Sequence, residues 1–171
     1  GLENRFSIMT KHLNRVVPLC EKYGMKAMMW SDMFFRIGAK SGDYYDPEVE
    51  FPQDLIDNMP NVDMVYWDYY HHDEESYTTS FANHKKLQRP IIFAGGVWTW
   101  NGMAPNYGKS FATTEAGLAA AKKQGIKEVY ATMWGDDGQE TPHIAALLGM
   151  QQFAEEQYNA QPSRELIAER F

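Results

Sequence analysis

The feature that most constrains the fold of this chain is a short apolar segment that recurs four times and carries tryptophan at its end. The segments are MKAMMW, VDMVYW, PIIFAGGVWTW and EVYATMW, and the closing tryptophans are Trp30, Trp67, Trp98 and Trp134. Short apolar runs bounded by turn residues predict buried strands. The stretches between them have helical periodicity or helix caps, so strands and helices alternate. This alternation predicts an α/β fold with a parallel sheet built of right-handed crossover units.

The helices are predicted from apolar spacing and from their end signals. Gly24 is placed to cap the first, Asp73 to open the third and Thr141-Pro142 to start the fifth. In chain order, helices are predicted at residues 6–23, about 53–59, 73–87, 113–125, from 141 onward and 163–171.

The connections between these elements differ in length according to their direction. Links from helix to strand are short, whereas two links from strand to helix are long, at residues 34–52 and 101–111. Long loops after strands are typical of a TIM barrel, whose site lies at the carboxyl ends of its strands. A doubly wound sheet also alternates, but its usual glycine-rich phosphate turn is absent. A complete barrel typically needs about 250 residues, so 171 residues with four strands predict about half of one.

Composition excludes several classes of partner. The net charge is −7 and no run of Lys or Arg occurs, so neither nucleic acid nor an anionic membrane is an expected partner. No apolar run approaches the roughly 20 residues of a transmembrane helix, and GLENRFSIM does not have the features of a signal peptide. Cys20 is the single cysteine, so no internal disulfide is expected. We expect a cytoplasmic protein without a cofactor.

The strand ends combine aromatic rings with carboxylates. Residues two apart on a strand point the same way, which gives the pairs Trp30 with Asp32, Tyr66 with Asp68, Trp98 with Trp100, and Trp134 with Asp136. Aromatic rings stack on the C–H faces of a pyranose, and carboxylates accept hydrogen bonds from its hydroxyls. The four pairs therefore predict a sugar pocket at the barrel mouth.

Each of these features also has a purely structural interpretation. A single tryptophan at a strand end is usually a core residue, and a single aspartate after a strand is usually a turn or N-cap residue. We interpret Ser31, Asp73 and Asp137 in this second way. Four pairs in the same phase favour the sugar site.

Three further patterns are ambiguous in the sequence. The run HHDEE at 71–75 could supply metal ligands, but adjacent histidines point apart and the acids suit a helix start, so no metal is predicted. Tyr44 and Tyr45 lie in a long loop, where they could reach a substrate or face solvent. Gly95-Gly96 within a strand predicts a bulge or a close backbone approach.

Four motifs resemble those of a known enzyme family. MMWSDMFFR, VYWDYY, FAGGVWTWNGMAPN and ATMWGDDG, in this order, closely resemble the catalytic domain of glycoside hydrolase family 20, the β-N-acetylhexosaminidases. The closest similarity is to bacterial N-acetyl-β-D-glucosaminidases that lack the usual N-terminal elaborations. The resemblance implies a TIM barrel that removes terminal N-acetylglucosamine or N-acetylgalactosamine from β-linked glycans. The substrate's own acetamido oxygen is the nucleophile, and the configuration is retained.

The resemblance also implies roles for individual residues. Tyr66 matches the tyrosine that holds the acetamido oxygen and steadies the oxazolinium intermediate. Asp68 matches the acid that binds the sugar's outer hydroxyls. Asp136 stands where many family members have the glutamate that binds the 4-hydroxyl, and Asp137 is the alternative. The walls of the pocket match Trp30, Trp134 and one of Trp98 and Trp100.

The family's catalytic acid has no counterpart in these motifs. In the family, an adjacent Asp-Glu pair ends the fourth barrel strand, which precedes the position where this chain begins. The Asp-Glu at 73–74 follows the wrong strand. We therefore expect residues 1–160 to form the C-terminal half of the barrel, about strands five to eight, and residues 161–171 to start a further helical segment.

Several functional hypotheses remain open at this stage. The first is an exo-β-N-acetylhexosaminidase fragment that is inactive alone, and that self-associates or pairs with the missing N-terminal half-barrel. The second is a non-catalytic carbohydrate-binding or interaction module. The third is another glycosidase that uses Asp32, Asp68 and Asp136 directly.

Overall fold

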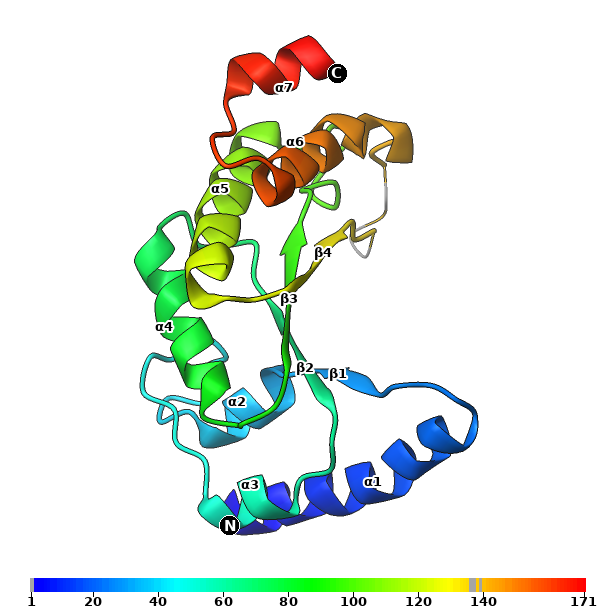
Figure 1. The fold of residues 1–171 in the computed structure, drawn as a ribbon, viewed down its shortest axis with the longest axis vertical. Helices are drawn as coiled ribbons and strands as arrows, with labels where there is room; N and C mark the ends of the chain where they lie inside the picture. Colours follow the sequence, from blue (N-terminus) through cyan, green and yellow to red (C-terminus); the bar gives the residue numbers. More distant parts are fainter. Residues whose placement is uncertain (1, 136–137, 139) are drawn as a thin grey trace. The chain divides into compact units, whose positions relative to one another are not determined.

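The computed structural model of the chain describes residues 2–135, 138 and 140–171, in which helices and strands alternate (Figure 1). The strands are β1 (Met28–Trp30), β2 (Asp63–Trp67), β3 (Ile91–Gly96) and β4 (Glu128–Thr132). The helices are α1 (Leu2–Lys22), α2 (Asp32–Gly38), α3 (Gln53–Asn58), α4 (Glu74–Lys85), α5 (Tyr107–Gln124), α6 (Leu147–Tyr158) and α7 (Arg164–Arg170), with a 3-10 turn η1 (His143–Ala146) before α6.

The strands form one parallel sheet in the order β1-β2-β3-β4. In the first pair, Met28 lies opposite Asp63 and Trp30 opposite Val65. The predicted α/β fold with a parallel sheet is therefore confirmed. Its extension to half a TIM barrel stays a prediction.

Four helices differ from the sequence prediction. Helix α1 begins at Leu2 rather than at Phe6, and the helix predicted from Thr141-Pro142 starts with the 3-10 turn η1, so that α6 begins only at Leu147. Helix α2 lies where a long loop is predicted, because β1 ends at Trp30 and Ser31 starts a helix at once. Helix α5 begins six residues earlier than the predicted Thr113. The Asn106 side chain caps it by accepting a hydrogen bond from the Lys109 N–H (3.1 Å), so the capping residue is the asparagine rather than a threonine.

The chain divides into two compact units. Unit 1 consists of Gly1–Trp67 and Thr79–Ile92, and unit 2 of Asp68–Thr78 and Phe93–Phe171. In unit 1, Phe6 of α1 packs against Phe34 of α2, with ring centroids 6.4 Å apart. In unit 2, α6 reaches the end of β3 because Gly95 and Gly149 have no side chain. A Cβ on Gly95 would lie 2.8 Å from the Phe153 ring, and a Cβ on Gly149 would lie 2.6 Å from a Val97 methyl group.

In the described part of the chain, no helix combines the length and the apolarity that crossing a membrane requires. Helix α7, which corresponds to the predicted terminal segment, is attached to α6 by an ion pair of 2.8 Å between Arg170 and Glu155. Its N-cap is Ser163, whose hydroxyl accepts a hydrogen bond from the Leu166 N–H.

A buried chain of hydrogen bonds holds the strand ends of unit 1 together. Ser31 Oγ lies 2.7 Å from His84 Nε2 and 3.0 Å from the Tyr44 hydroxyl, which accepts a hydrogen bond from the Trp67 N–H (3.2 Å). His84 Nδ1 lies 2.7 Å from the Ser80 carbonyl. A carbonyl only accepts, so Nδ1 carries the proton. Nε2 of the neutral ring is then an acceptor, and the single Ser31 hydroxyl proton is shared between it and the Val65 carbonyl (3.0 Å).

Burial keeps His84 neutral. The side chain is 1% exposed, and its desolvation lowers the pKa of His84 from 6.5 to about 3. An unfolded chain has no such burial and protonates His84 at its ordinary pKa. The contribution of His84 to stability is therefore complete above pH 6.5 and is lost as the pH falls towards 3.

We predict that the free energy of unfolding decreases as the pH is lowered from 6.5, with a slope of up to about 1.4 kcal/mol per pH unit from this one proton. The His84→Phe variant should have a flatter profile between about pH 6.5 and 5, above the range in which most carboxylates titrate. Urea unfolding across this range measures the slope. The His12→Gln variant, changed at an exposed position of α1, is the control and should keep the wild-type slope.

Candidate functional site

Four of the predicted site residues lie in unit 2, each just after a strand. Asp68 directly follows β2, Trp98 and Trp100 follow β3, and Trp134 follows β4. The loops that carry them are joined by hydrogen bonds from Asp68 N–H to the Ala94 carbonyl (3.1 Å) and from Thr99 Oγ1 to the Trp134 carbonyl (3.2 Å). Unit 2 thus contains the segments that follow three strands, and hydrogen bonds join these segments to one another.

An aromatic cluster forms the centre of this region. It consists of Tyr69, Tyr70, Trp98 and Trp100, and we call it the Trp98 cluster. The two indole rings lie 4.3 Å apart at 30°, and the Trp98 Nε1–H donates to the Tyr69 carbonyl (2.7 Å). Tyr69 meets Trp100 edge-on at 5.0 Å, and Tyr70 meets Trp98 edge-on at 5.3 Å. The two edge-on geometries are among those that aromatic pairs prefer.

Lys109 covers the Trp98 cluster from the first turn of α5. Its Nζ lies 3.6 Å from the Trp98 ring centroid and 5.3 Å from that of Tyr70, which is a cation–π contact. Trp100, whose ring centroid is 4.3 Å away, and Lys109 both contact the Trp98 ring, which is 3% exposed.

The predicted close approach at Gly95-Gly96 is confirmed. A Cβ on Gly96 would lie 2.8 Å from Tyr69 Cδ1 and 3.1 Å from the Trp100 ring. The bare backbone of β3 at Gly96 is therefore the surface on which the Trp98 cluster rests.

Asp68 is buried, and several groups fix its carboxylate. The residue is 1% exposed. Its Oδ1 accepts from the N–H groups of Tyr70 (2.9 Å) and His71 (3.3 Å), and its Oδ2 lies 2.6 Å from His71 Nδ1. The imidazole and the two amides thus hold the carboxylate from two directions.

Two other predicted residues, Trp30 and Tyr66, belong to unit 1. Trp30, at the end of β1 in unit 1, is 40% exposed. Tyr66 is fully buried in unit 1, where its ring lies 5.1 Å from Phe81 and 4.6 Å from His84 of α4. Tyr66 is thus a core residue in this conformation, and its role towards an acetamido group stays a prediction. Asp136 and its alternative Asp137 lie outside the described residues.

The ambiguous loop tyrosines are mostly structural. Tyr44 is 3% exposed and packs 4.8 Å from the Trp67 ring, while the Tyr45 hydroxyl donates to the Trp67 carbonyl (3.3 Å). Of the two histidines in HHDEE, His71 is engaged with Asp68. Within residues 2–135, 138 and 140–171, no three potential ligand side chains are grouped as a metal site.

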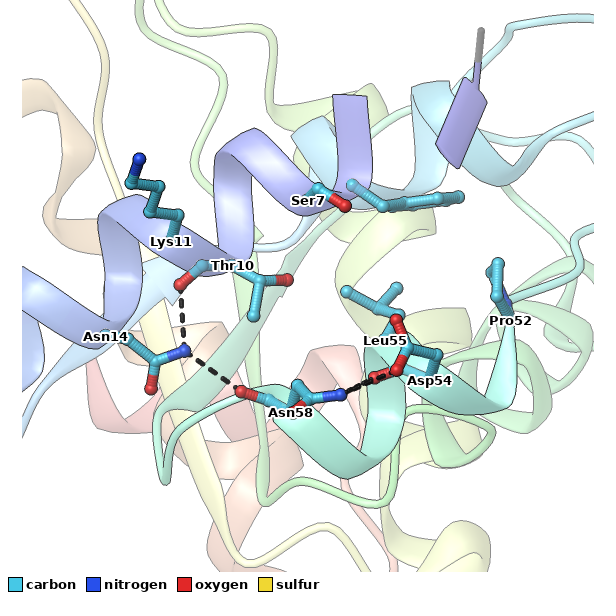
Figure 2. A pocket seen from close by; sticks show the side chains of 9 residues that line it. Ser7, Thr10, Lys11, Asn14, Pro52, Asp54, Leu55 and Asn58 are labelled. Carbon is cyan, nitrogen blue, oxygen red and sulfur yellow. Dashed lines mark hydrogen bonds between the residues drawn. The ribbon is translucent and has the colours of Figure 1, made fainter. Parts of the chain in front are cut away.

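Unit 1 contains a half-open cavity of about 510 Å³ between α1 and α3. Figure 2 shows Asn14 at its wall, donating to the Thr10 and Asn58 carbonyls (3.0 Å each), with Asn58 donating in turn to Asp54 (2.8 Å). None of the predicted site residues lines this cavity.

Sequence reasoning missed Tyr69, His71 and Lys109 as neighbours of the predicted site. Tyr69 lies within the motif VYWDYY but was given no role there, and Lys109 belongs to none of the four motifs. Lys109 lies in a segment predicted as a loop, because α5 begins at Tyr107 and the predicted helix begins at Thr113. His71 stood in a run that suggested a helix start, whereas its partner is the aspartate three residues earlier.

Compared with known proteins, the chain matches no protein-family model and no curated protein. Membership of the glycoside hydrolase family therefore stays a prediction from the motifs.

We predict that Gly96→Ala destabilises the protein by about 1–3 kcal/mol, the usual cost of inserting a methyl group into a packed region. The new Cβ has to displace the Tyr69 ring, 2.8 Å away, so the near-ultraviolet circular dichroism of the tryptophans should change as well. Gly108→Ala is the matched control, because its Cβ would meet nothing closer than 3.8 Å. An unchanged spectrum in Gly96→Ala would contradict the packing described for the Trp98 cluster.

Proposed function

We propose that this chain is the sugar-binding half of a retaining exo-β-N-acetylhexosaminidase, which releases terminal N-acetylglucosamine or N-acetylgalactosamine. The observation that carries the proposal is the assembly of Asp68, Trp98, Trp100 and Trp134 at the carboxyl ends of successive parallel strands. In α/β proteins with parallel sheets, ligands bind at this end of the strands.

The proposed chemistry is substrate-assisted. The acetamido oxygen attacks the anomeric carbon, and the aglycone leaves with a proton from a carboxylic acid. In this scheme Asp68 and Asp136 bind hydroxyls, tryptophans enclose the ring, and Tyr66 steadies the oxazolinium intermediate. Tyr66 has to become accessible for this role, because its side chain is 0% exposed.

The one Asp-Glu sequence of the chain, at 73–74, does not suit the role of the acid. Asp73 caps α4, accepting from the Ser76 N–H (2.8 Å) and from Ser76 Oγ (2.9 Å). These hydrogen bonds lower the pKa of Asp73 and commit its carboxylate to the helix cap, while the neighbouring Glu74 forms an ion pair with Lys123 (2.6 Å). We therefore propose that the acid belongs to the barrel half that this chain lacks.

A pyranose has to displace side chains in order to stack on the indole rings, because Trp98 and Trp100 are 3% and 4% exposed. Tyr70 is 43% exposed, and both it and Lys109 contact Trp98. Movement of these two side chains would uncover the Trp98 ring, so they are the proposed entrance.

We predict that the purified chain does not hydrolyse chromogenic aryl N-acetyl-β-D-glucosaminides at an enzymatic rate. Without a positioned acid it lacks a contribution of about 10²- to 10⁴-fold. Without a carboxylate to orient the acetamido nitrogen, it loses about another 10²-fold. The assay compares the chain with its Asp68→Asn, Asp136→Asn double variant and with the complete product of the gene, which should be active.

Two outcomes of this assay would contradict the proposal. Rapid turnover by the wild-type chain, together with no turnover by the double variant, would favour a glycosidase that uses these aspartates directly. Inactivity of the complete gene product towards N-acetylhexosaminides would argue against the hexosaminidase assignment itself.

We also expect the chain to self-associate. Its outermost strands carry exposed apolar side chains, with Met28 of β1 52% exposed and Tyr130 of β4 38% exposed. Unpaired edge strands of this kind favour pairing with another chain. Sedimentation velocity should show dimers or larger species, reduced in Met28→Lys, and a stable dilute monomer would contradict the half-barrel proposal.

A further inference from the structure

His71 is the side chain that most directly fixes the carboxylate of Asp68. Its Nδ1 lies 2.6 Å from Asp68 Oδ2, whereas the backbone amides of Tyr70 and His71 contact the other oxygen. The imidazole therefore holds Oδ2, while the two amides hold Oδ1.

The His71 ring is itself held in place. Its backbone carbonyl accepts a hydrogen bond from the Tyr77 hydroxyl (2.9 Å), and the two rings meet edge-on at 6.1 Å. Tyr77 is fully buried, and burial raises the pKa of its hydroxyl, so it remains a donor at every physiological pH. Tyr77, His71 and Asp68 thus form a connected series that leads from α4 to the end of β2.

A buried carboxylate needs partners of this kind. An ionised group without compensation in an apolar interior is strongly destabilising, and a histidine–carboxylate pair supplies both a donor and, when protonated, a charge. The side chain of His71 is 30% exposed while that of Asp68 is 0% exposed. The pair therefore extends from the interior towards the surface beside Tyr70.

We infer that His71 is a positioning residue for sugar recognition, holding Asp68 in the orientation in which it binds the outer hydroxyls of an N-acetylhexosamine. This inference rests on the proposed function and adds a residue to which neither the motifs nor the resemblance assigns a role. Loss of the His71 donor should weaken recognition of the hydroxyls and leave recognition of the acetamido group unchanged.

The experiment measures affinities of the complete gene product for two competitive ligands. One is the thiazoline analogue of the N-acetylglucosamine oxazolinium intermediate, and the other is the same compound without its 4- and 6-hydroxyls. His71→Leu should bind the first about tenfold more weakly, the loss expected for one hydrogen bond to a charged group, and the second as tightly as wild type.

Two further variants separate positioning from folding. His71→Asn places an amide donor near the Nδ1 position and should restore most of the affinity, whereas the longer side chain of His71→Gln should not. Asp68→Asn should show the same selective loss as His71→Leu. This comparison holds even if His71→Leu fails to fold.

The outcomes distinguish the inference from the proposed function. The proposed function stands if wild type prefers the hydroxylated ligand and Asp68→Asn loses this preference. If His71→Leu and His71→Gln nevertheless keep the preference, the inference about His71 is wrong. Equal losses for both ligands in the His71 variants would likewise overturn the positioning role. If wild type binds neither ligand, the proposed function fails and the inference fails with it.

Discussion

The buried carboxylate of Asp68 is the constraint on which the organisation of unit 2 depends. A carboxylate that is 1% exposed requires compensating donors, and Tyr70 and His71, close behind it in the chain, supply them. The resulting tight turn directs Tyr69 and Tyr70 onto Trp98 and Trp100. Gly96 makes this possible, because any side chain there would occupy the space of the Tyr69 ring.

Much of the fold could be predicted from local signals. Apolar runs located all four strands, Gly125 closes α5 in the left-handed conformation at φ 73°, and Asp73 caps α4. Helix α2 and the start of α5 were missed, because α2 is only seven residues long and α5 is capped by Asn106 within an apparent loop. Local patterns are weakest where tertiary packing decides the element.

The candidate site could be predicted only in part, and the reason is geometric. Period-two alternation places Tyr66 and Asp68 on one side of a regular strand, but β2 ends at Trp67 and Asp68 already belongs to a turn. The surroundings of Tyr66, which are Phe81 and His84, depend on how the following helix α4 packs back on β2. The contact of Lys109 depends on where α5 begins, and that of His71 depends on the local turn after Asp68, and no sequence pattern predicts either.

The most direct test of the sugar-site account uses the five tryptophans of the chain. In an ¹H–¹⁵N spectrum each indole N–H gives its own signal, and the protein can be titrated with the thiazoline analogue. The account predicts shifts of the Trp98, Trp100 and Trp134 indole signals and of the Tyr70 and His71 amides that contact Asp68. Shifts confined to residues of the cavity between α1 and α3, or no shifts at millimolar ligand, would contradict it.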